Sequence, residues 1–414
     1  MTMLYGCIGE RLGHSFSKEI HNKIGSYSYE LKEIPREELD DFMRKKDFLG
    51  INVTIPYKEK VMPHLYEIDE GALAIGAVNT VVNRDGKLYG YNTDFFGMKK
   101  LVEHAGISVK GKKVAILGTG GTSKTARAVM RRLGASKILI VSRRKEGESI
   151  LYDELYQKHK DTEVIVNTTP VGMFPNAEEA PLDLSFFKNL SGVIDAVYNP
   201  LCTRLICDAK KRGIPAEGGL YMLVAQAVFA SEIFLGTTYD PSLLENIYKS
   251  ILHSKENIVL IGMPASGKTT VGRLLAKKLA RPFTDTDELI TMTEGESIPD
   301  IFKKQGERGF RKLECAAISN ASALVGSVIA TGGGAILNQQ NVNNLMQNGR
   351  IFFLDRPLEL LIPTEDRPLG STKEAIEKRY NERYALYCAS CHYHIDASGD
   401  PEAIANTIIE EFLK

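Results

Sequence analysis

The segment GMPASGKTT, residues 262 to 270, limits the possible folds of this chain more than any other. It fits the pattern G-x-x-x-x-G-K-[ST] at each fixed position, directly after the apolar run Asn257–Ile261. This pattern joins a buried strand to a helix, and its backbone amides surround phosphate groups. The sequence therefore predicts a phosphate-binding loop, with Lys268 on the β and γ phosphates and Thr269 on Mg²⁺. The nucleotide is expected to contact Gly262, Ala265, Ser266, Gly267, Lys268, Thr269 and Thr270.

A second glycine-rich segment, GTGGTS at residues 118 to 123, follows the apolar run Lys113–Leu117. The helical stretch Thr122–Leu133 and the apolar run Lys137–Val141 come next, so these segments predict a βαβ unit. Ser123 stands where the third glycine of a dinucleotide-binding loop would be, and the loop alone is weak evidence. We expect Gly118, Gly120 and Gly121 to approach the cofactor.

The residues after the second strand of this unit bear on the choice of cofactor. Enzymes that use NAD commonly place an acid there for the ribose hydroxyl, but this chain has Ser142, Arg143 and Arg144. Arginines suit a 2′-phosphate, so the sequence predicts NADPH. The alternative is a basic strand end that binds no ligand.

Two loops of different kinds imply more than one domain, and 414 residues are too many for one ordinary core. Apolar runs at 3–9, 29–34 and 50–55 predict a first α/β layer with a mainly parallel sheet. The apolar spacing of Met222–Phe234 suits a helix that packs against this layer. We interpret the polar stretch Ser250–Asn257 as a linker. The prediction is an α/β fold in which a first part with a mainly parallel sheet and a βαβ unit is followed by a second nucleotide-binding domain.

Composition favours small-molecule partners. Lysine plus arginine and aspartate plus glutamate both number 52, so no net charge attracts the chain to nucleic acid or to an anionic membrane. No apolar run is long enough to span a membrane and no secretory signal is visible, so the cytoplasm is the expected compartment. The six cysteines do not form a disulfide framework. Cys388 and Cys391 with His392 and His394 suggest zinc only weakly, because a second ligand pair is missing. A homo-oligomer remains open.

Several motifs follow the phosphate loop: FTDTDELI at 283–290, GERGFRKLE at 306–314, ATGGGAIL at 330–337, DRPLG at 366–370 and RYALY at 383–387. With this series, the chain from about residue 256 to 414 resembles shikimate kinase. The resemblance implies Asp285 near the metal, Asp287 as the acceptor of the substrate proton, and Arg367 in a lid. It also implies a shikimate site built from Arg311, Gly332, Gly333, Gly334 and Arg383. The segment before the lid is shorter than expected and lacks the family's usual additional arginine.

A second series spans the first 250 residues: GHSFSKEIHN at 13–22, GINVTIPYKEK at 50–60, AIGAVNTVV at 74–82, GYNTDFFG at 90–97, NTTPVGMFP at 167–175, DAVYNPLCTRL at 195–205 and GGLYMLVAQA at 218–227. This part of the chain resembles shikimate dehydrogenase. The resemblance implies Lys58 and Asp94 as the catalytic pair and the loop near Met222 at the nicotinamide. It implies substrate contacts from Ser15, Ser17, Thr54, Asn79, Tyr198 and Gln226. Lys18 stands where proline is expected, and the segment 145–163 is short.

Together, the two resemblances imply a dehydrogenase-like domain at 1–252, with a substrate part (about 1–103 and 222–248) and a Rossmann-like NADP part (about 104–221), and a P-loop kinase-like domain with a parallel sheet at 253–414. They also imply NADPH-dependent reduction of 3-dehydroshikimate to shikimate, followed by MgATP-dependent phosphorylation of shikimate. Alternatives are a quinate/shikimate dehydrogenase with a weak kinase domain, and a metabolite-sensing regulatory protein built from these domains. A regulatory protein would be expected to lose Lys58, Asp94 or Lys268, and all three are present. Arg143 and Arg144 argue against a quinate dehydrogenase that uses NAD.

Overall fold

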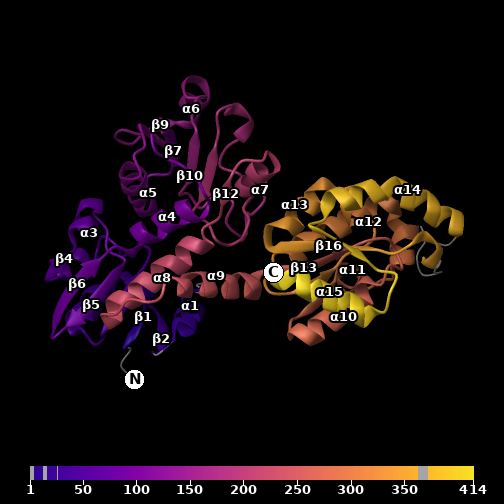
Figure 1. Ribbon diagram of the computed structural model, residues 1–414, viewed down its shortest axis with the longest axis horizontal. Coiled ribbons are helices and arrows are strands. Elements are labelled where there is room, and N and C mark those ends of the chain that lie inside the picture. The colour runs from indigo at the N-terminus through magenta and orange to yellow at the C-terminus, as the bar shows by residue number, and fades with distance from the viewer. Residues whose placement is uncertain (1–3, 13–15, 26, 362–371) are drawn as a thin grey trace. The chain divides into compact units, whose positions relative to one another are not determined.

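The computed structural model describes residues 4–12, 16–25, 27–361 and 372–414 (Figure 1). The chain divides into two compact units, each described below by itself. The first unit holds Met1–Met173, Glu179–Asn199 and Asp208–Ile251, and the second holds Phe174–Glu178, Pro200–Cys207 and Leu252–Lys414. In the described part of the chain, no helix combines the length and the apolar character needed to cross a membrane.

The first unit contains a six-stranded sheet with the order β2-β1-β3-β5-β6-β4. Side chains alternate between the two faces of each strand, so Ile8 packs in one apolar cluster and Cys7 in another. Helix α8 (Leu220–Leu235) packs on helices α1 and α4 and adds Phe234 to the second cluster, as its apolar spacing predicts. The strands are β1 (Tyr5–Gly9), β2 (Tyr29–Glu33), β3 (Gly50–Val53), β4 (Glu67–Ile68), β5 (Thr80–Arg84) and β6 (Lys87–Tyr91); the other helices are α1 (Ser17–Ile24), η1 (Arg36–Glu38), α2 (Leu39–Lys45), η2 (Met62–His64), α3 (Glu70–Ile75) and α4 (Thr93–His104).

Most strand pairs of this first sheet are parallel, as predicted, but two pairs are antiparallel. Strand β5 pairs antiparallel with both β3 and β6. Between β5 and β6, Asp85 and Gly86 have φ angles of 52° and 78°. A two-residue turn with positive φ at both positions matches the twist of two antiparallel strands. The Asp-Gly pair thus forms a hairpin that apolar periodicity alone does not reveal.

The second sheet of the first unit is parallel in every pair and has the order β12-β11-β10-β7-β8-β9. Its strand order reverses at β7 (Lys113–Leu117), which has the predicted bounds. Ligands of such sheets bind at the carboxyl ends of the strands beside this reversal. The short segment after β8 (Lys137–Ser142) retains a strand and a helix. The remaining elements are α5 (Gly121–Arg132), β9 (Ile150–Leu151), α6 (Tyr152–Lys158), β10 (Val164–Asn167), η3 (Leu184–Phe186), β11 (Gly192–Asp195), α7 (Arg204–Lys211) and β12 (Ala216–Glu217).

The second unit is built on a parallel sheet with the order β14-β15-β13-β16-β17. Every residue of its central strand, β13 (Asn257–Ile261), is buried. Val259 packs in one apolar cluster and Leu260 in the cluster on the other face, as expected for a parallel strand covered on both sides. The other elements are α10 (Lys268–Leu279), β14 (Phe283–Asp285), α11 (Thr286–Glu294), α12 (Ile298–Ser322), β15 (Val328–Ala330), η4 (Ala335–Leu337), α13 (Gln339–Asn348), β16 (Gly349–Asp355), η5 (Leu358–Leu360), α14 (Lys373–Ser390), β17 (Tyr393–Asp396) and α15 (Pro401–Leu413).

The segment interpreted as a polar linker contains the boundary between the two units, after Ile251, but it is mostly helical. Helix α9 (Ser242–Lys255) continues to within one residue of β13. Its last turn belongs to the second unit and is bonded within that unit, because Gly326 N–H donates to Lys255 O at 2.8 Å. Arg281 Nη1 donates to the next carbonyl, Glu256 O, at 2.7 Å. These bonds satisfy the end of a helix whose polar side chains resemble a loop in sequence.

Candidate functional site

Two cavities collect most of the side chains that the sequence selects. The cavity of the first unit has a volume of about 390 Å³, and the cavity of the second unit has a volume of about 600 Å³.

Lys58 and Asp94 form the charged centre of the first cavity. Lys58 lies in the loop after β3, and Asp94 lies in the first turn of α4, where the helix dipole favours a carboxylate. Lys58 Nζ is 2.5 Å from Asp94 Oδ2, and the two side chains are only 20% and 12% exposed. This contact holds an ammonium group at the cavity wall, where it can donate a proton to a bound oxygen.

Most of the residues expected to contact the first substrate line this same cavity. Burial raises the pKa of Tyr198, so its hydroxyl keeps its proton and remains a donor. Ser15 lies outside the described residues. The predicted residues that the cavity brings together are Ser17, Thr54, Lys58, Asn79, Asp94, Tyr198, Met222 and Gln226.

The cavity is also lined by residues that the sequence analysis did not identify. Cys7 and Asn52 face it from the neighbouring strands β1 and β3, and Thr122 reaches it from α5. Burial raises the pKa of the Cys7 thiol to about 12, although the charge of Lys58 opposes this shift. A signal was available for Asn52, because a polar residue inside the apolar run INV needs a buried partner.

The loop between β7 and α5 leaves room for a cofactor. A β-carbon added at Gly120 or Gly121 would meet no atom within 4 Å, so a phosphate group can approach the amides at the start of α5. Gly118 has a φ of 108°, and its carbonyl accepts a hydrogen bond from Ser123 Oγ at 2.7 Å. Ser123, which stands in place of the third glycine, therefore bonds back to the first residue of the loop and stabilises its conformation.

The end of β8 separates three residues that the sequence groups together. Ser142 is buried, and its hydroxyl bonds to the carbonyl of Arg144 and lies 3.2 Å from Ser149 Oγ. Arg143 and Arg144 are exposed. The serine thus shapes the turn, whereas the two arginines are accessible to an anionic group.

The phosphate-binding loop of the second unit has the backbone that its glycines require. Gly262 and Gly267 have φ angles of 151° and 92°, and Ala265 has a φ of 65°. Lys268 is buried, and its Nζ donates to the carbonyls of Gly262 and Met263 at 2.9 and 2.8 Å. The lysine side chain therefore folds along the loop that would surround the phosphates.

Two hard oxygen ligands meet beside this loop. Thr269 Oγ1 donates to Asp285 Oδ2 at 2.8 Å, and Asp285 Oδ1 accepts the N–H of Asp287 at 3.0 Å. A hydroxyl and a carboxylate this close together suit Mg²⁺, because this ion usually takes only a few protein oxygens and completes its coordination with water and phosphate oxygens. These residues fit the metal that the sequence predicts.

A glycine turn after β15 brings the backbone close to the charged side chains of the second cavity. A β-carbon added at Gly332 would lie 2.6 Å from Asp287 Oδ1, and one at Gly334 would overlap Arg311. One added at Gly333 would lie 2.7 Å from Pro264 of the phosphate loop. The glycines therefore bring the charged groups and the phosphate loop around one cavity.

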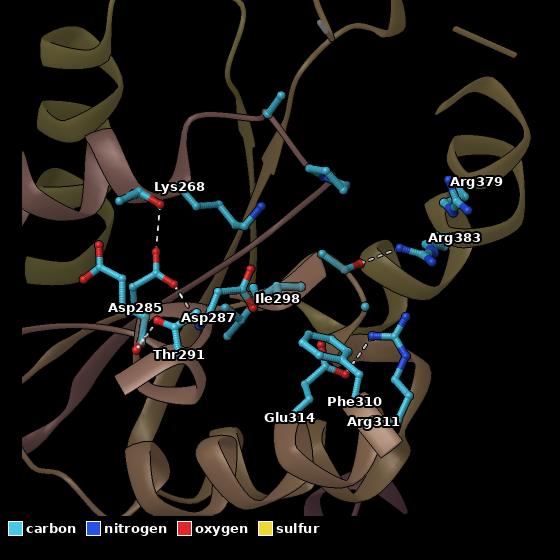
Figure 2. A pocket seen from close by; sticks show the side chains of 18 of the residues that line it. Lys268, Asp285, Asp287, Thr291, Ile298, Phe310, Arg311, Glu314, Arg379 and Arg383 are labelled. Carbon is cyan, nitrogen blue, oxygen red and sulfur yellow. Dashed lines mark hydrogen bonds and ion pairs between the residues drawn. The ribbon is translucent and has the colours of Figure 1, made fainter. Parts of the chain in front are cut away.

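The arginines of the second cavity lie on the side away from its two aspartates (Figure 2). In Figure 2, Asp285 and Asp287 lie on the left, and Arg311, Arg379 and Arg383 lie on the right. Arg383 is buried, and its Nη1 donates to the carbonyl of Gly333 at 3.0 Å. This separation suits a ligand with an anionic group at one end and a reacting hydroxyl at the other.

Glu314 and Arg379 line this cavity but were not identified from the sequence. Glu314 is buried and bonds to Arg311 Nη1 at 2.9 Å. Burial raises the pKa of Glu314, although Arg311 opposes the shift. For Arg311, burial lowers the pKa, but Glu314 and Glu307 together raise it by more, so the net shift is upward. Glu314 follows Arg311 by three residues, and Arg379 precedes Arg383 by four. Because residues three or four apart share a helix face, this spacing could have indicated that both line the cavity. Arg367 lies outside the described residues.

Comparison with known families gives one match in each unit. Residues 264–413 match the family model described as shikimate kinase. Residues 7–81 match the model described as the shikimate dehydrogenase substrate binding domain.

Individual relatives extend the second match along the first part of the chain. A shikimate dehydrogenase (NADP(+)) of Clostridium perfringens is 40% identical over an alignment of 266 residues, and the match covers 60% of this chain and 98% of that protein. The crystal structure of shikimate dehydrogenase 1 from Peptoclostridium difficile is 38% identical with a TM-score of 0.55, and it covers 60% of this chain and 97% of its own. A Thermus thermophilus shikimate 5-dehydrogenase, solved in complex with NADP(H) and shikimate, is 29% identical with a TM-score of 0.54 over 60% of this chain and 99% of its own.

Proposed function

Since the chain belongs to the shikimate dehydrogenase family over its first 60% and continues into a shikimate kinase domain, we propose that it is a bifunctional enzyme of the shikimate pathway. The first unit reduces 3-dehydroshikimate to shikimate with NADPH. The second unit phosphorylates the 3-hydroxyl of shikimate with MgATP. The product of the first reaction is the substrate of the second.

The observation that carries the reductase activity is the 2.5 Å contact between Lys58 and Asp94 in a cavity that Thr122 of α5 also lines. The ion pair and the start of the cofactor-binding helix therefore share one space. NADPH, when bound, supplies the hydride. Lys58 donates a proton to the carbonyl oxygen as negative charge develops there, and Asp94 holds the ammonium group in place.

The two exposed arginines after β8 support NADPH rather than NADH. Guanidinium groups form charge-assisted hydrogen bonds with phosphate, and only NADPH carries a 2′-phosphate. We assign the cofactor to Gly118, Gly120, Gly121, Arg143 and Arg144, with Ser142 shaping the turn between them.

In the second unit, the side chains position the reactants and neutralise charge. MgATP, when bound, supplies the phosphoryl group. Lys268 would neutralise the phosphates, and Thr269 and Asp285 are the residues that would hold Mg²⁺. Asp287 accepts the proton of the attacking hydroxyl. Arg311 and Arg383 bind the carboxylate of shikimate through charge-assisted hydrogen bonds.

A product analysis tests both activities in one protein. The purified chain is incubated with 3-dehydroshikimate, NADPH and MgATP, and shikimate and shikimate 3-phosphate are separated by chromatography. We expect both products, and we expect only shikimate from Lys268→Met, because the loop backbone cannot replace the lost charge. If the wild-type chain makes neither product, the proposed function is wrong. If Lys268→Met still makes the phosphate ester at the wild-type rate, the assignment of the ATP site is wrong.

A further inference from the structure

A row of buried polar side chains lies behind the first cavity and is not used by the chemistry above. It connects Tyr29 on β2 to Asn52 on β3, Thr80 and Asn79 beside β5, and Thr93 at the start of α4. All five residues are at most 7% exposed. Buried polar groups cost free energy unless they are hydrogen-bonded, and each of these five side chains has a partner within the row.

One backbone group fixes the direction of bonding along this row. The N–H of Thr93 can only donate, and it bonds to Asn79 Oδ1 at 2.7 Å. The amide nitrogen of Asn79 therefore faces the other way and donates to Thr93 Oγ1 at 3.1 Å. Thr80 Oγ1 also donates to Asn79 Oδ1, at 3.1 Å. Thr93 Oγ1 also lies 3.1 Å from Thr80 Oγ1. Because the single proton of the Thr80 hydroxyl points toward these two oxygens, the hydroxyl accepts from its other neighbour.

That other neighbour is Asn52, whose orientation follows. Asn52 Nδ2 donates to Thr80 Oγ1 at 3.1 Å and to the carbonyl of Asn79 at 3.4 Å. Both amide protons of Asn52 are thus directed into the protein. Its Oδ1 accepts one hydrogen bond, from the Tyr29 hydroxyl at 2.6 Å. A carboxamide oxygen has two lone pairs, so Oδ1 can accept a second donor, from the cavity or from the neighbouring His21 ring, which also interacts with Asn52.

Tyr29 is well suited to hold this orientation. Burial raises the pKa of Tyr29 well above its usual value, so the hydroxyl keeps the proton that it donates. Its ring stacks on His21 with centroids 3.7 Å apart and planes at 8°. The donor is therefore fixed in position, and it lies behind a residue that lines the first cavity.

We propose that Tyr29 is a positioning residue for the dehydrogenase substrate: it holds Asn52 so that the carboxamide oxygen accepts a hydrogen bond from a ring hydroxyl. This inference rests on the proposed function of the first unit. It makes the cavity selective for a hydroxyl at the ring position that faces Asn52. A carbonyl there would bring a second acceptor against the oxygen.

The test uses Tyr29→Phe in the full chain, with Tyr27→Phe as the matched control. The hydroxyl of Tyr27 lies in the same aromatic cluster but bonds to His21 Nδ1 at 2.6 Å. Shikimate oxidation by NADP⁺ is followed at fixed pH for both variants. We expect Tyr29→Phe to raise the KM for shikimate about tenfold, the size of one lost hydrogen bond, with kcat and the KM for NADP⁺ within about twofold of wild type. Tyr27→Phe should leave the KM for shikimate within about twofold.

Substrate analogues separate positioning from a general structural effect. With 4-deoxy- and 5-deoxyshikimate, the penalty of Tyr29→Phe should disappear for the one analogue that lacks the hydroxyl bound by Asn52. A purely structural role would impose the same penalty on every substrate. Equal penalties for shikimate and both analogues, or equal KM values for the two tyrosine variants, would overturn the proposal.

A second variant, Thr80→Val, tests the inference even if Tyr29→Phe does not fold. Thr80→Val removes the acceptor of the Asn52 amide and leaves Tyr29 in place, and it should raise the KM for shikimate by a similar factor. A wild-type KM in Thr80→Val would also overturn the inference. If the wild-type chain itself does not oxidise shikimate with NADP⁺, the proposed function fails, and this outcome is distinct from equal KM values among active variants.

Discussion

Lys58 and Lys60 are two residues apart in the chain but lie in different environments. Lys58 contacts Asp94 at the first cavity, whereas Lys60 is exposed. Replacing Lys58 with Ala should lower the rate of 3-dehydroshikimate reduction at least about 100-fold, because the proton donor is lost. Shikimate-dependent ATP consumption by the same chain should persist. The rates are measured from NADPH absorbance and from ADP release, with Lys60→Ala as the control. Near-normal reduction by Lys58→Ala would remove this lysine from the mechanism.

His21 makes the stability of the first unit sensitive to acid. Burial lowers the pKa of His21 to about 3, whereas a histidine in the unfolded chain titrates near 6.5. Between these values the unfolded state binds more protons, so stability is lost as pH falls below about 6.5. From pH 7 to pH 5 this residue alone should cost about 2 kcal/mol.

The measurement for His21 is chemical denaturation at pH 7 and pH 5. His21→Phe keeps an aromatic ring against Tyr29 and has no group that titrates in this range. Its stability should therefore fall less on acidification than that of the wild type, by about 2 kcal/mol. Equal losses in the two proteins would show that His21 is not the group responsible.

The positions of single residues also show which parts of the first cavity could be predicted from the sequence and which could not. Lys58 and Asp94 stand in segments specific enough to select, and the structure places them in contact. Cys7 and Asn52 line the same cavity, but their exposure to it depends on the pairing of β1 with β3. That pairing joins segments more than 40 residues apart, and periodicity within either segment cannot specify it.

At the scale of elements, the turn after β15 depends on the absence of side chains. A β-carbon at Gly334 would overlap the Arg311 guanidinium, so Gly334→Ala should displace that arginine. We expect the KM for shikimate in the kinase reaction to rise at least about tenfold, since charge-assisted hydrogen bonds contribute about 1.5–3 kcal/mol. Gly399→Ala is the control, because a β-carbon there would meet no atom within 4 Å. An unchanged KM in Gly334→Ala would indicate that Arg311 does not bind the substrate.

The end of β8 should determine the choice between the two nicotinamide cofactors. Changing both Arg143 and Arg144 to Ala should raise the KM for NADPH by about 10- to 100-fold, because charge-assisted contacts with the 2′-phosphate are lost. The KM for NADH should change little. Initial rates with each cofactor at saturating 3-dehydroshikimate give the comparison. Equal weakening of both cofactors would favour the alternative of a basic strand end without a ligand.

Elements with a strong local signal could be predicted, and elements defined by tertiary contacts could not. The apolar runs before the two glycine-rich loops gave β7 and β13 with the bounds that the structure has. The last turn of α9 is polar, and its carbonyls are satisfied by Gly326 and Arg281, which lie far away in the sequence. Nothing local distinguishes such a turn from a linker.

At the scale of the whole molecule, the end of α9 decides where the chain can be divided. Arg350 bonds to both carboxylate oxygens of Glu256, at 2.7 and 3.3 Å, and both side chains are 16% exposed. A kinase fragment that begins at Leu252 keeps this pair, and one that begins at Asn257 loses it. Loss of a largely buried partner costs about 1–3 kcal/mol, which corresponds to a lower Tm of about 2–12 °C for a domain of this size.

Calorimetry of the two fragments, 252–414 and 257–414, tests this expectation, and ADP release with shikimate shows whether each fragment is active. The longer fragment should have the higher Tm, and both should consume ATP when shikimate is present. Glu256→Gln in the longer fragment should lower its Tm by part of the difference between the two fragments. Identical Tm values for the two fragments would mean that the start of β13 needs no support from α9.

The thiol in the first cavity has a consequence for inhibitor chemistry. Alkylating groups react with thiolates, and with a pKa of about 12 only about one Cys7 in 10⁵ is ionised at pH 7. An electrophilic compound that enters this cavity therefore meets an almost inert sulfur, while the exposed Cys388 on α14 is open to the same reagent. An alkylating compound would therefore label Cys388 of the second unit rather than the cavity of the first. Compounds directed at the dehydrogenase cavity must depend on reversible contacts with its polar walls.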